Sequence, residues 1–327
     1  MDTRRSLDSQ ALGLMLVFCL TLGMQQVALK ATADDISPVL QVALRSGIGA
    51  LLVGGYVLAR RQRLMFGDGN WKPGLVVGAL FSLEYLLLGE ALRFTSASHA
   101  VVFLYTAPVF AALLLHFRVP DERMARLQWG GIGLAFAGIA VAFLGPSGPA
   151  EAGSGLSVLW GDLLALLAGA AWGATTVVIR TSRLARVPAE QTLLYQLAAA
   201  FVLLLSGALA LDQLAIDPTP LALASLGFQS VIVSFGGFLV WFWLLRHYQA
   251  SRIGVLSFMT PLFGVGFGAW LLHEPIESGF LVGAVLVIAG ISLVSGYGWL
   301  KTPGQRRRKA AAEAVARAGG CEARAVR

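Results

Sequence analysis

The sequence predicts an all-α integral membrane protein in which ten transmembrane helices form two inverted five-helix repeats. Three observations lead to this fold class. Apolar stretches long enough to cross a bilayer follow one another through most of the chain. Basic residues are concentrated in every second connection between these stretches. The two halves of the apolar region also match one another in sequence.

The apolar stretches define the expected helices. Hydrophobic residues make up 57% of the 327 residues and charged residues only 13%, a composition far from that of a soluble domain. A helix needs about 20 residues to span the hydrocarbon core, and charge, Pro or Gly bounds each run where the chain can re-enter water. The expected spans are approximately 11–30, 37–59, 73–92, 96–117, 127–144, 157–179, 190–211, 220–245, 251–272 and 279–298.

The positions of the basic residues predict how the helices are oriented. If the N-terminus is cytoplasmic, 22 of the 25 Lys and Arg residues lie on the cytoplasmic side, whereas Lys30 and Arg93 lie outside and Arg45 lies within a span. The positive-inside rule therefore places both termini in the cytoplasm, in a multi-pass protein of the cell (inner) membrane. The net charge of +7 follows from this topology and from contact with anionic lipid, so no nucleic-acid partner is expected.

A cleaved signal peptide is an alternative interpretation of the first span. Arg4 and Arg5 precede an apolar run, and residues 31–33 resemble a small-residue cleavage site. Cleavage would leave nine spans and would remove from the first half a helix that the second half retains. We therefore expect this segment to remain as the first transmembrane helix.

An internal repeat appears when the chain is aligned with itself at a separation of 153 residues. Thirteen identities fall within about 48 positions if one residue is dropped; they include Pro108 with Pro261, Phe110 with Phe263, and Gly131 and Gly138 with Gly283 and Gly290. Gly23 aligns more weakly with Gly173. Each copy holds five spans, so the second must cross the membrane in the opposite sense. Inverted repeats are typical of alternating-access transporters, although a duplication kept only for packing is also consistent with the pattern.

These repeated segments resemble the EamA domain of the drug/metabolite transporter superfamily. The resemblance lies in residues 91–98 and 105–108, then Glu122, and in residues 245–251, 259–261 and 274–275 of the second copy. Trp172-Gly173 resembles the usual start of a unit, but the first unit has Leu22-Gly23 there and lacks the aromatic residue.

The resemblance covers residues 11–298 and implies ten helices. It places a first unit at 11–144 and a second at 157–298. With the orientation that the positive-inside rule predicts, the linker at 145–156 is external, and the N-terminus at 1–10 and the basic tail at 299–327 are cytoplasmic. By the same resemblance, the protein would move small metabolites such as amino acids or related compounds, often outward.

Glu84 is the most informative polar residue because it lies near the middle of the third span. A carboxylate there costs several kcal/mol on insertion scales and normally faces a bundle interior or water. It is a candidate for proton coupling or substrate contact, or else a protonated structural acid bonded to a neighbouring helix. Arg45 in the second span could pair with Glu90 near the outer end of the third, or, if unpaired, bind a substrate carboxylate.

Further polar and aromatic residues within the spans predict a mixed lining for a central cavity. The complete candidate substrate path is Gln25, Gln26, Arg45, Glu84, Tyr85, Tyr105, Trp172, Thr176, Tyr195 and Gln229. Each polar residue taken alone is more often a hydrogen-bonding contact between helices. Pro108 and Pro261 occupy matching places in the fourth and ninth spans and are candidate hinges, and static kinks are equally compatible with them.

Several chemistries have no sequence support. There is no Walker-type phosphate loop, the four histidines lack metal-site spacing, and Cys19 and Cys321 offer no disulfide framework, so we expect no cofactor and no metal. An intramembrane lipid-modifying enzyme and a channel are alternative functions. We expect instead a non-enzymatic secondary transporter, monomeric or homodimeric, whose partners are a small-molecule substrate and membrane lipid.

Overall fold

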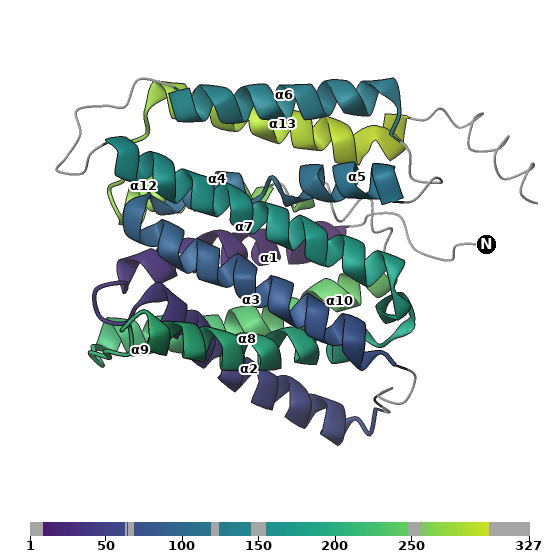
Figure 1. The fold of residues 1–327 in the computed structure, drawn as a ribbon, viewed down its shortest axis with the longest axis vertical. Coiled ribbons are helices and arrows are strands. Elements are labelled where there is room, and N and C mark those ends of the chain that lie inside the picture. The colour runs from purple at the N-terminus through teal and green to yellow at the C-terminus, as the bar shows by residue number, and fades with distance from the viewer. Residues whose placement is uncertain are drawn as a thin grey trace, which may run out of the picture.

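The computed structural model describes residues 9–62, 64, 69–118, 124–144, 155–247, 256–257 and 259–300. Within these ranges the regular elements are helices, and an isolated antiparallel bridge joins Ile36 to Ile216. Seven helices are long and apolar enough, by length and composition, to cross a membrane, and two shorter apolar helices accompany them. Figure 1 shows the helices side by side in one bundle. The chain is therefore an all-α membrane protein.

Two helices of the first half, α2 and α4, start at serine caps that the sequence supplies. The Ser37 hydroxyl accepts a hydrogen bond from the amide of Leu40, and Pro38 fills the first helical position of α2. Ser96 caps the next short helix in the same way. The elements are α1 (Ser9–Ala31), α2 (Pro38–Ala59), α3 (Trp71–Phe94), α4 (Ala97–Leu104), α5 (Ala107–Arg118) and α6 (Arg126–Leu144).

The second half repeats this order with one irregular span. Its elements are α7 (Gly155–Thr181), a 3₁₀ turn (Arg183–Arg186), α8 (Ala189–Ala210), α9 (Pro220–Gly227), a π-helical segment (Phe228–Gly237), α10 (Phe238–His247), α12 (Met259–Leu271) and α13 (Ser278–Leu300). The predicted N-terminal segment 1–10, linker 145–156 and tail 299–327 lie almost wholly outside the described residues.

Two of the expected spans are not single α-helices. The span expected at 96–117 is divided at Tyr105 and Thr106, and the one expected at 220–245 contains the π-helical segment. Pro108 is the second residue of α5 and Pro261 the third of α12. In the first turn of a helix the missing amide hydrogen costs little, so these prolines begin helices instead of kinking them midway. Residues 248–255 and 258, which include the start of the span expected at 251–272, lie outside the described ranges.

The outer surface of the bundle is rich in apolar side chains. Leu51 and Leu58 are both 78% exposed and Phe117 is 76% exposed. Such exposure is unusual for a soluble protein but is expected where helices face lipid tails. Inside the bundle, small side chains such as Ala43 and Ala91 are fully buried and let helix backbones approach closely.

Helices α6 and α13 lie together at one edge of the bundle (Figure 1) and meet through glycines. A Cβ atom added to Gly138 would lie 2.6 Å from the carbonyl oxygen of Gly283, and one added to Gly290 would lie 2.5 Å from that of Gly131. Residue numbers rise along α6 as they fall along α13, so the two helices are antiparallel.

A second pair of contacts joins the first helix of each half to the fourth span of the other half. A Cβ atom at Gly23 of α1 would lie 2.9 Å from the Cβ of Phe263 in α12. A Cβ atom at Gly173 of α7 would lie 2.8 Å from the Cβ of Phe110 in α5. The sequence alignment matches Gly23 with Gly173 and Phe110 with Phe263, so equivalent residues make equivalent contacts.

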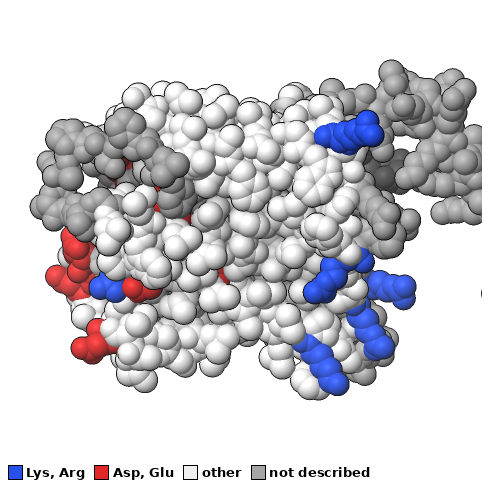
Figure 2. Space-filling model, turned by 45° about the horizontal axis from the view of Figure 1, so that its top comes forward, with Lys and Arg blue, Asp and Glu red and all other residues white. Residues whose placement is uncertain are grey.

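The two ends of the bundle carry opposite charge, as Figure 2 shows. We call the acidic end the one formed by residues 31–38, 94–97, 210–220 and 271–278. There the Thr219 hydroxyl donates to a carboxylate oxygen of Asp35 over 2.9 Å, and the Gln213 amide donates to Glu90 over 2.7 Å. The opposite, basic end carries Arg60, Arg61, Lys72, Arg118, Arg126, Arg180, Arg183 and Arg186. Lys30 and Arg93 belong to the acidic end, as the sequence predicted.

Candidate functional site

Two oppositely charged side chains lie buried inside the bundle, Glu84 near the middle of α3 and Arg45 about two turns from the acidic end of α2. Arg45 of α2 is 2% exposed and Glu84 of α3 is 4% exposed. The guanidinium carbon of Arg45 lies 4.5 Å from the centre of the Tyr85 ring, a cation–π contact. Arg45 also attracts the Glu84 carboxylate electrostatically. Two buried charges that partly compensate one another cost less than either alone.

Some polar atoms of this pair have no hydrogen-bond partner among the described residues. They are Nε and Nη1 of Arg45 and Oε2 of Glu84. The Gln26 carbonyl oxygen is also buried without a partner among the described residues. Buried polar atoms normally have hydrogen-bond partners. Where they lack one, a bound ligand or water can supply it.

Aromatic side chains surround these polar atoms. The Gln25 amide donates to the Tyr85 hydroxyl over 3.5 Å. Tyr105, at the division between α4 and α5, meets the Trp172 ring edge-to-face with centroids 5.2 Å apart. The Thr260 side chain lies within hydrogen-bonding reach of the Tyr105 hydroxyl, and Glu84, Tyr85 and Cys19 are the electrostatic neighbours of Tyr105. We call Gln25, Arg45, Glu84, Tyr85, Tyr105, Trp172 and Thr260 the central cluster.

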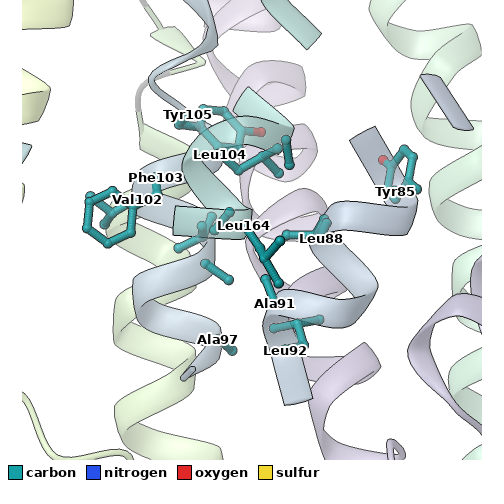
Figure 3. Close-up of a cluster of buried hydrophobic side chains, with 14 of the residues drawn as sticks. Tyr85, Leu88, Ala91, Leu92, Ala97, Val102, Phe103, Leu104, Tyr105 and Leu164 are labelled. Atoms are coloured by element: carbon teal, nitrogen blue, oxygen red, sulfur yellow. The ribbon is translucent and has the colours of Figure 1, made fainter. Parts of the chain in front are cut away.

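Along α3, apolar side chains lie between Glu84 and the acidic end. Figure 3 shows Leu88, Ala91 and Leu92 following Tyr85 along α3, with Leu104 and Leu164 beside them. Leu88, Ala91 and Leu92 are completely buried. Apolar side chains therefore fill this face of α3 between Glu84 and the acidic end.

A second polar network holds helices together nearer the acidic end. The Gln41 amide donates to the carbonyl oxygen of Ile36 over 2.7 Å, and its own side-chain oxygen accepts from Thr32 and from Gln229, each over 3.0 Å. Gln229 donates to Ser225 over 3.0 Å as well. These hydrogen bonds fit the role of interhelical contacts, although the side-chain oxygen of Gln229 is buried without a partner among the described residues.

The structure brings together six of the ten residues that the sequence singled out for a substrate path. They are Gln25, Arg45, Glu84, Tyr85, Tyr105 and Trp172. Gln26 is buried beside Gln25 in sequence, with its carbonyl oxygen unpaired among the described residues.

The other three path residues lie elsewhere. Thr176 is exposed, and its hydroxyl donates to the Trp172 carbonyl in its own helix. The Tyr195 ring packs against Gly74 between α3 and α8. Gln229 belongs to the network around Gln41.

The suggested pairing of Arg45 with Glu90 does not occur. One Glu90 oxygen accepts from Arg93 over 2.9 Å and the other from Gln213 over 2.7 Å. Arg93 lies one helical turn after Glu90, and the connection between α8 and α9 brings Gln213 close, so both oxygens are satisfied at the acidic end. The electrostatic partner of Arg45 is Glu84 instead.

Two residues of interest were missed by the sequence interpretation. Thr260 lies next to Tyr105 and immediately precedes Pro261, so the Thr-Pro pair at the start of α12 was an available signal. Gln41 stands one helical turn before Arg45, and its depth in the second span was a similar signal. Within the described ranges, no three His, Cys, Asp or Glu residues gather as they would to hold a metal ion.

Comparisons with known proteins agree on a family of membrane transporters. The family model described as "EamA-like transporter family" matches residues 10–144 and again residues 159–296. The chain is 27% identical to the "Uncharacterized transporter YoaV" of Bacillus subtilis over 271 residues, covering 82% of this chain and 91% of that protein. It is 30% identical to the "Uncharacterized transporter YvbV" of the same organism over 269 residues, covering 81% and 85%.

More distant similarities add a functional name and a fold. A "Probable amino-acid metabolite efflux pump" of Salmonella typhimurium is 28% identical over 219 residues, covering 64% of this chain and 71% of that protein. A solved crystal structure superposes with a TM-score of 0.61 at 21% identity, covering 88% of this chain and 97% of that one. At that identity the superposition bears on the fold alone.

Proposed function

We propose that this chain, which belongs to the EamA-like transporter family, is a secondary transporter that exports small metabolites, such as amino acids or related compounds, by alternating access. The name of the Salmonella relative supports this substrate class. The observation that carries the proposal is the central cluster, where buried atoms of Arg45 and Glu84 lack hydrogen-bond partners among the described residues. A polar solute bound there would supply those partners.

Ten transmembrane helices in two inverted five-helix units, 11–144 and 157–298, form the scaffold in this proposal. Two facts support the inversion. Helices α6 and α13, which correspond in the sequence alignment, pack antiparallel through Gly138 and Gly283. Gly23 and Gly173, which also correspond, each pack on the other half at matching residues. A twofold axis parallel to the membrane would produce both kinds of contact.

The orientation in this proposal places the basic end in the cytoplasm. The cluster of Arg and Lys residues at that end supports it through the positive-inside rule. Both termini are then cytoplasmic, and the linker 145–156 is external. Reporter fusions in the linker and in the 182–188 connection test this orientation, because they must report opposite sides of the membrane.

In the proposed site, Arg45 binds a carboxylate of the substrate and Glu84 couples proton movement to transport. The planar guanidinium suits a carboxylate, and Nε and Nη1 are the atoms left to receive it. Tyr85, Tyr105 and Trp172 form the apolar walls. The start of α5 at Pro108 and the start of α12 at Pro261 are the proposed points of bending between states.

Transport in proteoliposomes tests the role of Glu84. Solute flux is measured with and without a pH gradient for the wild type, for Glu84→Gln and for Glu90→Gln. Glu84→Gln is expected to abolish the response of flux to the gradient. Glu90 lies on the same helix and is satisfied by Arg93 and Gln213 at the acidic end, so Glu90→Gln is expected to keep the response. A pH response retained in Glu84→Gln would remove Glu84 from the coupling mechanism.

A further inference from the structure

The carboxylate of Glu274 is bound to the first turn of α4. Glu274 lies in the connection between α12 and α13. One of its oxygens accepts from the amide of Ala97 over 2.6 Å, and the other accepts from the amide and the hydroxyl of Ser98 over 3.0 Å and 2.6 Å. The first amides of a helix have no partner within the helix, and an anion placed there is stabilised by the helix dipole as well.

The connection that holds Glu274 is shaped for this contact. The carbonyl oxygen of Gly268 accepts from the amides of Leu272 and Glu274 over 3.1 Å and 3.2 Å, so the chain turns back on the end of α12. His273 adopts a left-handed conformation with φ of 53° in this turn. A Cβ atom at position 268 would collide with both the Glu274 carboxylate and the Ser98 hydroxyl. Glycine at 268 is therefore required for the contact.

This contact joins the two halves of the protein. The α4 helix belongs to the region 10–144 matched by the family model, and Glu274 belongs to the region 159–296. A second carboxylate of the second half also reaches the corner between α3 and α4. Asp162 of α7 accepts from the Thr95 hydroxyl over 2.5 Å and lies 2.9 Å from Nδ1 of His99.

Lys30 of α1, in the first half, also contacts the connection between α3 and α4. Its ammonium donates to the carbonyl oxygen of Leu92 in the last turn of α3 and to that of Thr95 just after it, and it attracts the Glu274 carboxylate. Below this corner lies the apolar layer of Leu88, Ala91 and Leu92, and below that the central cluster. The contact between α4 and the α12–α13 connection therefore lies on the acidic side of this apolar layer.

We propose that the bond between Glu274 and the N-terminus of α4 is the gate that closes the central cluster from the acidic end. It must break once in each transport cycle. This inference rests on the proposed alternating-access function and specifies the contact that controls one side of it. Hydrogen bonds to a charged group are strong enough to hold a closed state, yet few enough here to be broken by a moderate input of binding energy.

Cysteine labelling tests the gate without any knowledge of the substrate. Cys19 is completely buried and lies next to Tyr105 in the central cluster. In a Cys321→Ser background it is the remaining thiol of the chain. A membrane-impermeant, charged maleimide is applied to right-side-out vesicles, and the rate of Cys19 labelling is measured. A Cys19→Ser variant sets the background.

Gly268→Ala and Glu274→Gln are expected to speed this labelling by at least about tenfold, since hydrogen bonds to a charged group shift an equilibrium by that factor. The matched control is Gly266→Ala, because a Cβ atom at position 266 of the same helix meets nothing within 4 Å. It should label at the wild-type rate. Monodisperse elution of each purified variant establishes that it is folded.

Labelling of both Gly268→Ala and Glu274→Gln at the rate of Gly266→Ala would overturn the gate. The experiments distinguish failure of the gate from failure of the proposed transport function. Absence of solute flux in the wild type together with faster labelling of the variants would refute transport and leave the contact as a closing device. Wild-type flux with unchanged labelling would refute the gate alone.

Discussion

Packing of α6 on α13 gives a sharp test of the helix arrangement through the substitution Gly138→Ala. The new Cβ atom would lie 2.6 Å from the carbonyl oxygen of Gly283 and 2.6 Å from the amide nitrogen of Val287. Ordinary contact begins at 3.4 Å, so the backbones must separate by about 0.8 Å, in an interior packed as densely as a crystal. Both neighbours are main-chain atoms and cannot move aside by changing a rotamer.

The expected cost is that of overpacking, about 1–3 kcal/mol. At about 2–4 °C per kcal/mol, that corresponds to a fall in melting temperature of about 2–12 °C. Melting is measured in detergent by the loss of monodisperse protein on size-exclusion chromatography. The double variant Gly138→Ala/Gly283→Ala should lose less than the two single losses added together, because the first substitution already separates the helices.

Gly133→Ala is the matched control in the same helix. A Cβ atom there meets nothing within 4 Å, and alanine is the better helix former, so the melting temperature should stay level or rise. Equal melting of Gly138→Ala and Gly133→Ala would refute the close approach of α6 and α13, and with it the main geometric support for an inverted repeat.

Two other predictions concern the buried polar groups, and both use the same melting assay. Arg45→Leu should destabilise the fold by about 2 kcal/mol because it removes the buried cation–π contact with Tyr85 and the positive charge that attracts Glu84, whereas the double variant Arg45→Leu/Glu84→Leu should regain part of that loss; a double variant less stable than the single one would contradict the electrostatic attraction. Gln41→Leu should cost about 2–3 kcal/mol, since the buried amide of Gln229 and the carbonyl oxygen of Ile36 lose a partner; wild-type melting would show that the network around Gln41 contributes nothing to stability.

The sequence predicted the helices well because their apolar runs are long. It did not predict the break at Tyr105 and Thr106, which depends on a helix distant in sequence. There Gly169 of α7 packs so closely that its Cβ atom would lie 2.8 Å from the carbonyl oxygen of Phe103. The π-helical segment 228–237 has no simple periodic signal in the sequence either. It differs from an α-helix only in that each backbone amide donates to the carbonyl five residues earlier instead of four.

For the candidate site, the sequence predicted how deep a residue lies in the membrane but not which side of its helix the residue occupies. Glu84 stood out because a carboxylate in the middle of a span is costly. Thr176 has the same depth signal as its neighbours, yet it lies on the exposed side of α7. Glu90 found its partner in Gln213, more than a hundred residues away, which spacing along the chain could not reveal.

The contact of Glu274 with α4 shows a further limit of sequence interpretation. The match between Glu122 and Glu274 marked this acid as part of a repeated pattern. Its partners, however, are the backbone amides of Ala97 and Ser98, and an amide leaves no trace in the side-chain sequence. Such sites are found only once the two segments are seen together in space.

The glycine contacts between α6 and α13 have a consequence for the origin of the chain. Gly131 and Gly138 occupy the positions in the first copy that Gly283 and Gly290 occupy in the second, and each meets the other's counterpart. One copy alone therefore carries a self-complementary face, so two identical subunits inserted in opposite directions could associate isologously through it. Joining their genes would turn that pairing into a permanent intramolecular contact. The two copies could then accumulate different mutations, because a change in one would no longer appear in the other.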